Sequence, residues 1–146
     1  MPLIANARDI LRTNLEQIRD GKKAKTVAIG TLSDKQLAGI NANRLVDGLP
    51  PIVAEVVFVG SHIYKSRIIG DGYTIEDVLD QISSAMEDIS KVVKSLKMTG
   101  IENPNSRQDR YGNQVRDRAV FECSARHPRP ELFSVMPKGD KTKPTK

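Results

Sequence analysis

The sequence is poor in cysteine, in aromatic residues and in long apolar runs. Among 146 residues Cys123 is the only cysteine, so the chain forms no internal disulfide and a reducing, cytoplasmic compartment is expected. The longest apolar run, residues 52–59, is far shorter than the roughly 20 residues of a membrane-spanning helix. The two histidines, His62 and His127, are far apart and the acids are scattered. We therefore expect no membrane partner, no metal site and no cofactor.

Common nucleotide-binding and hydrolase motifs are missing as well. The chain has no G-x-x-x-x-G-K-[ST] loop, no strand-linked G-x-G-x-x-G and no G-x-S-x-G elbow. What it has is positive charge, because 23 Lys and Arg against 18 Asp and Glu give a formal net charge of +5. Residues 140–146 are predicted to be a disordered basic tail behind a single domain of residues 1–139. The charge balance indicates a polyanionic partner such as nucleic acid.

Hydropathy periodicity predicts an α+β domain. Apolar residues at helical spacing indicate a first helix over residues 3–18, and a capping box at Ser33 begins a second that continues to about residue 45. Thr74 begins a long third helix whose apolar stripe continues to Leu96. Strands are expected at residues 27–29, 52–59, 115–126 and 132–136, with a loop at 100–112. The expected fold is N-terminal helices packed on one face of a largely antiparallel sheet of about four strands.

A charged face is predicted for the strand at residues 115–126. Alternate residues of a strand share a face, so Val115, Asp117, Ala119 and Phe121 lie opposite a polar row. That row consists of Arg116, Arg118, Val120, Glu122, Ser124 and Arg126. Because the planar guanidinium group binds phosphate through two hydrogen bonds, the row indicates a phosphate-binding surface. The alternative is a solvated face on which Glu122 pairs with Arg118 or Arg126.

A second set of polar residues, 61–67, follows the most apolar strand, residues 52–59. Together with the polar row of the strand at 115–126, it suits RNA cleavage without a metal. Such cleavage needs a base for the 2′-hydroxyl, an acid for the leaving 5′-oxygen and cations at the phosphate. The expected catalytic residues are His62, Lys65, Arg67, Glu122 and His127, with His62 as acid or base and Glu122 or His127 as its complement. The expected RNA or phosphate ligands are Tyr64, Arg110, Arg116, Arg118, Ser124, Arg126 and Ser134. Each residue also has an ordinary structural or solvated reading, and His127 beside Pro128 is typical of a turn.

Three segments resemble a known family of nucleases. They are residues 61–67 (SHIYKSR), 71–77 (DGYTIED) and 131–139 (ELFSVMPKG). With the order of helices and strands, they resemble the barnase, EndoU, colicin and RelE (BECR) superfamily of small ribonucleases, in a branch carried by phages and other mobile elements. The resemblance implies a toxin-type, metal-independent endoribonuclease, with transfer RNA (tRNA) as one candidate substrate. It also implies a cognate inhibitor or immunity protein as a partner.

Two functions without chemistry stay open. One is a nucleic-acid-binding accessory of a mobile element, which needs only the basic face. The other is a protein-interaction module whose charged face docks on an acidic partner. The nuclease hypothesis depends on His62 lying on the same side of the sheet as the arginine row, since one active site needs both.

Overall fold

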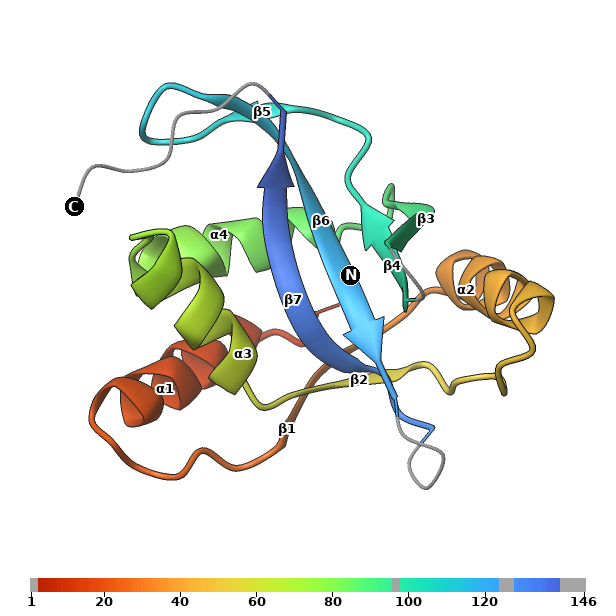
Figure 1. The fold of residues 1–146 in the computed structure, drawn as a ribbon, viewed down its shortest axis with the longest axis horizontal. Coiled ribbons are helices and arrows are strands. Elements are labelled where there is room, and N and C mark those ends of the chain that lie inside the picture. The colour runs from red at the N-terminus through yellow and green to blue at the C-terminus, as the bar shows by residue number, and fades with distance from the viewer. Residues whose placement is uncertain (1–2, 96–97, 124–127, 140–146) are drawn as a thin grey trace.

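The structure, a computed structural model, describes residues 3–95, 98–123 and 128–139 (Figure 1). Its helices are α1 (Ala7–Arg19), α2 (Asp34–Val46), α3 (Ser61–Ile63) and α4 (Ile75–Ala85), with a π-helix, η1 (Tyr64–Gly70). Its strands are β1 (Val27–Thr31), β2 (Glu55–Phe58), β3 (Lys91–Ser95), β4 (Met98–Glu102), β5 (Arg107–Gln108), β6 (Gln114–Glu122) and β7 (Glu131–Lys138). The chain is therefore α+β, as its periodicity predicts. The basic tail expected at residues 140–146 lies outside the described residues.

The sheet is larger than expected, and it is mixed. Its order is β1-β2-β7-β6-β4-β3, and β5 pairs with the start of β6. The pairing of β2 with β7 is parallel, whereas the other pairings are antiparallel. The expectation of about four strands was therefore wrong, because the chain enters the sheet three more times, as β3, β4 and β5. The last strand, β7, lies in the middle of the sheet (Figure 1).

The helix expected from Thr74 to Leu96 ends early. Its start is as predicted, since Thr74 and Asp77 form a capping box. The helix ends at Ala85, whose carbonyl accepts a hydrogen bond from the Ser90 hydroxyl. Residues 91–95 then pair as β3 with residues 98–102, a segment that was partly expected to be a loop. Strand pairing thus overrides the helical spacing of the apolar residues after Ala85.

The helices α1, α2 and α4 pack on one face of the sheet, which we call the core face. The apolar stripes of α1 and α4, for example Leu11 and Leu79, are fully buried there with Ile101 and Ala119 of the sheet. Because side chains alternate along a strand, the other residues of β6 point to the opposite face, which we call the open face. Arg116 and Glu122 on the open face are exposed, while Val115 and Phe121 on the core face are buried.

Candidate active site on the open face

The register of β6 and β7 fixes which side chains face each other across the open face. The facing pairs are Arg116 with Lys138, Arg118 with Met136, Val120 with Ser134, and Glu122 with Glu131. Directly opposite residues have Cβ atoms about 4.5–5.5 Å apart. The open face therefore has two cations facing each other at one end of the ladder and two carboxylates at the other.

His62 lies against β7 through Phe133. The two rings stack with centroids 4.1 Å apart and planes 15° apart, and Ser66 Oγ lies 3.4 Å from His62 Nε2. Phe133 is the extra residue of a β-bulge, because Leu132 faces Phe121 and Ser134 faces Val120. Its neighbours Leu132 and Val135 belong to the buried core cluster, whereas Phe133 does not. The imidazole therefore lies beside β7 at this bulge, between the residues that face Phe121 and Val120.

The carboxylates of Glu122 and Glu131 form the acidic end of the open face. Partial burial raises the pKa of Glu131 above its ordinary value, and the negative charge of Glu122 raises it further. A proton on Glu131 therefore relieves the repulsion between the two groups. Glu131 was missing from the residues expected to be catalytic. The signal that would have found it is the register of the last hairpin, which puts an acid opposite Glu122.

Two arginines of the predicted site, Arg118 and Arg67, are already paired with carboxylates. Arg118 donates to Glu102 at 3.1 Å and 3.2 Å, and Lys91 lies 3.4 Å from the same carboxylate. Arg67 forms an ion pair with Asp71 at 2.8 Å. The solvated-face alternative pairs Glu122 with Arg118 or Arg126. Arg118 pairs with Glu102 instead, and Arg126 lies outside the described residues.

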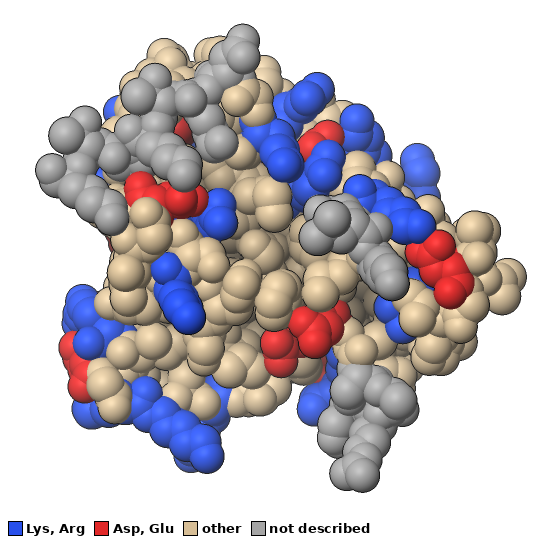
Figure 2. All heavy atoms as spheres, in the orientation of Figure 1, with Lys and Arg blue, Asp and Glu red and all other residues tan. Residues whose placement is uncertain are grey.

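Three cations near the open face or α3 form no ion pair among the described residues: Arg116, Lys138 and Lys65. Arg116 and Lys65 are exposed and Lys138 is half-buried. Figure 2 shows Lys and Arg gathered over the upper part of this face and a separate group of Asp and Glu near its lower centre. Side chains with unpaired positive charge can bind an anion without first breaking an ion pair.

Other predicted ligands lie elsewhere. Arg110 forms an ion pair with Asp77 at 2.9 Å and covers the Tyr111 ring, near the start of α4 on the core face. Tyr64 is half-buried in η1 and packs against the core. Ser134 is on the open face but buried. Ser124, Arg126 and His127 lie outside the described residues.

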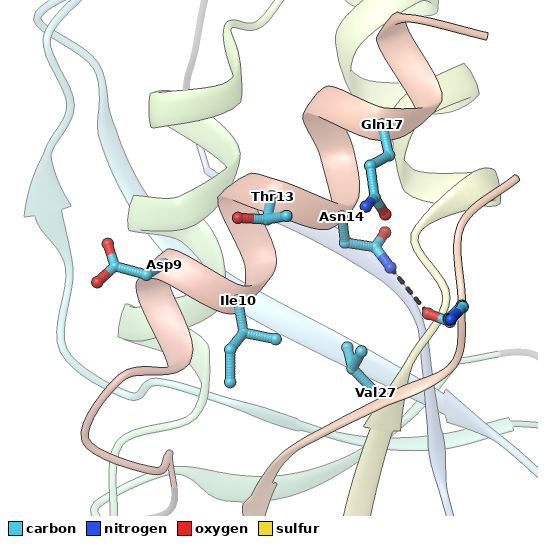
Figure 3. Close-up of a pocket in the computed structure, with 7 residues that line it drawn as sticks. Asp9, Ile10, Thr13, Asn14, Gln17 and Val27 are labelled. Carbon is cyan, nitrogen blue, oxygen red and sulfur yellow. Dashed lines mark hydrogen bonds between the residues drawn. The ribbon is translucent and has the colours of Figure 1, made fainter. Parts of the chain in front are cut away.

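A groove of about 350 Å³ lies between α1 and the segment that leads into β1 (Figure 3). Ile10 and Val27 contribute apolar walls, and the Asn14 amide donates to the Lys25 carbonyl at 3.1 Å. Its lining is mostly apolar and does not include His62 or the β6 row. The groove therefore adds nothing to the candidate active site.

The described part of the chain contains neither a cluster of metal ligands nor a helix that could span a membrane. No group of three or more His, Cys, Asp or Glu in that part is placed to hold a metal ion. Nor does it contain a helix that is long and apolar enough to cross a bilayer. Comparisons with known protein families, with curated proteins and with solved structures find no match to this chain.

Proposed function

We propose that the chain is a metal-independent endoribonuclease that binds RNA on the open face and cleaves it beside His62. The observation that carries the proposal is the stacking of His62 on Phe133, two residues along β7 from the facing carboxylates. An imidazole and a carboxylate pair beside an open sheet face supply an acid and a base without a metal. The resemblance to the small-ribonuclease superfamily supports the same reading.

The reaction follows from these groups. A carboxylate of the Glu122 and Glu131 pair accepts the proton of the 2′-hydroxyl while the 2′-oxygen attacks phosphorus. The bond from phosphorus to the 5′-oxygen breaks, and the His62 imidazolium gives its proton to that oxygen. The products are a 2′,3′-cyclic phosphate and a 5′-hydroxyl end. Lys65 follows His62 closely in sequence and forms no ion pair among the described residues. We assign it to the charge that develops on the phosphate.

The aromatic surface suits single-stranded RNA. The stacked rings of His62 and Phe133 form an aromatic surface two residues along β7 from Glu131. Unpaired bases stack on such platforms without regard to sequence, and stacking would hold a base while the adjacent phosphate reacts. The proposal therefore assigns single-stranded regions of RNA, including loops of tRNA, as the substrate.

The decisive test is RNA cleavage in the presence of chelator. Purified protein is incubated with total RNA and with tRNA in EDTA, beside His62→Ala and the surface control Lys35→Ala on α2. Wild type and Lys35→Ala should cut RNA, whereas His62→Ala should lose on the order of 100-fold or more in rate. Circular dichroism checks that each variant is folded. Cleavage by His62→Ala at the wild-type rate would refute the proposed role.

A second candidate function is RNA binding without cleavage. It is favoured by the position of Arg116 and Lys138, which lie at the end of the strands away from the carboxylates. Such a module would bind RNA with a strong dependence on salt and leave it intact. The same incubation separates the two, because a binding module shifts the RNA in a gel without shortening it.

A further inference from the structure

The facing cations Arg116 and Lys138 line a hollow at the start of β6. The hollow has a volume of about 270 Å³, and Ser106 and Gln114 contribute a hydroxyl and an amide to its wall. Among the residues that the structure describes, no carboxylate lines it. It is thus a concave site with two positive groups and two neutral hydrogen-bonding groups.

Among the described residues, no contact gives Arg116 and Lys138 a structural role. Elsewhere on the open face, Lys91 and Arg118 share the carboxylate of Glu102. Like charges directly opposite each other on neighbouring strands destabilise a sheet, and Arg116 and Lys138 form no ion pair with an acid among the described residues. An anion in the hollow would remove that repulsion.

We propose that this hollow binds a phosphate group of the RNA backbone. The inference rests on the proposed function and adds a subsite to it. The Arg116 guanidinium offers two donors in the plane that matches phosphate oxygens, Lys138 adds a point charge, and the Ser106 hydroxyl is a further donor. The strand places this subsite about 20 Å from Glu122, six residues away at about 3.3 Å each. RNA long enough to reach both sites has several nucleotides between the phosphate held here and the one that is cleaved.

The first experiment uses inorganic phosphate as the probe. Thermal unfolding of wild type, Arg116→Gln, Lys138→Gln and the charge-matched control Lys35→Gln is followed in phosphate and in chloride at equal ionic strength. A ligand that binds only the folded state raises the melting temperature. Phosphate should therefore raise it for wild type and Lys35→Gln and raise it less for the other two. An equal rise in all four proteins would overturn the site, and Lys138→Gln keeps the test open if Arg116→Gln does not fold.

The second experiment assigns the phosphate to RNA. The affinity for a long and a short single-stranded RNA is measured over a range of salt concentrations, with His62→Ala as background so that nothing is cut. Loss of one phosphate contact lowers the slope of log affinity against log salt by roughly 0.7 for single strands. Arg116→Gln and Lys138→Gln should show this loss with the long RNA only. An unchanged slope would overturn the assignment to RNA and leave a site for small phosphate compounds.

The two proposals fail separately. If neither wild type nor His62→Ala cleaves RNA but Arg116→Gln loses the phosphate effect, the subsite stands and the nuclease assignment falls. If Arg116→Gln and Lys138→Gln behave as wild type towards phosphate while His62→Ala is inactive, the nuclease stands and the subsite falls.

Discussion

The carboxylates of Glu122 and Glu131, which face each other across β6 and β7, affect the stability of the fold. Because the pKa of Glu131 is raised in the folded protein, its ionisation opposes folding, and stability is lost as the pH rises through that pKa. Glu131→Gln should therefore stabilise the protein by about 0.2–1 kcal/mol near neutral pH. The gain should vanish below about pH 4, the ordinary range of glutamate.

Urea unfolding of wild type, Glu131→Gln and Glu16→Gln at both pH values measures this difference. Glu16→Gln on α1 is the charge-matched control and should lack the pH-dependent gain. A gain for Glu131→Gln that is the same at both pH values would show that the repulsion between the two carboxylates is not its source.

A buried ion pair makes a second prediction about single residues. The Asp117 side chain is 0% exposed and accepts hydrogen bonds from Arg107 at 2.6 Å and 3.2 Å. Arg107→Met leaves that carboxylate buried without its partner, so a loss of about 3 kcal/mol in the free energy of unfolding is expected. The double variant Arg107→Met, Asp117→Val should recover most of the loss, because it removes the buried charge as well. Urea unfolding of the full double-mutant cycle tests this, and a double variant no more stable than Arg107→Met would contradict it.

Among the elements, the junction of β2 and α3 depends on Gly60. Its φ is +86°, and a Cβ there would lie 2.5 Å from the Asn14 side-chain oxygen and 2.8 Å from the Phe58 ring. Gly60→Ala should cost about 2 kcal/mol or more, since it combines backbone strain with a clash. Gly112, with φ of +84° and no atom within 4 Å, is the matched control. Gly112→Ala should cost only the backbone strain, about 1 kcal/mol.

Thermal or urea unfolding compares the two alanine variants. Gly60→Ala should also slow RNA cleavage under conditions where the variant is still folded, because α3, the helix that contains His62, begins directly after Gly60. Equal losses of stability in the two variants would mean that the contacts of Gly60 with Asn14 and Phe58 are not limiting.

The starts of elements could be predicted from the sequence, and several ends could not. The capping boxes at Ser33 and Thr74 are local hydrogen-bond patterns, and both are present. The polar composition of residues 100–112 predicts a loop, although residues 100–102 belong to β4. A Cβ at Gly100 would lie 2.0 Å from the Ala119 carbonyl oxygen, so glycine there permits β4 to approach β6. That reason comes from a strand distant in the sequence, which no local pattern contains.

At the scale of the whole molecule, the alternation of side chains along β6 predicts which β6 residues lie on the open face. The β7 residues that face them follow only from the strand register. The period of two separates Arg116, Arg118 and Glu122 from the buried residues of the strand. The facing residues on β7 follow from pairing and from the bulge at Phe133, which shifts the alternation so that Ser134 faces Val120. A bulge adds a residue without a sequence signal of its own, so the stacking of Phe133 on His62 could not be read from the sequence.

The division of charge over the molecule makes the final prediction. Under the proposed function, RNA phosphates are attracted to the cationic end of the open face and repelled by the carboxylates of Glu122 and Glu131, which the proposed reaction nonetheless requires. Glu122→Gln should therefore bind single-stranded RNA more tightly, with a lower KM, while kcat falls on the order of 100-fold. Steady-state kinetics with a labelled RNA measure both constants, and Glu16→Gln, which removes a charge far from the carboxylate pair, should change neither. A lower KM with unchanged kcat would leave Glu131 as the base, and a higher KM would contradict the division of charge because less repulsion cannot weaken binding.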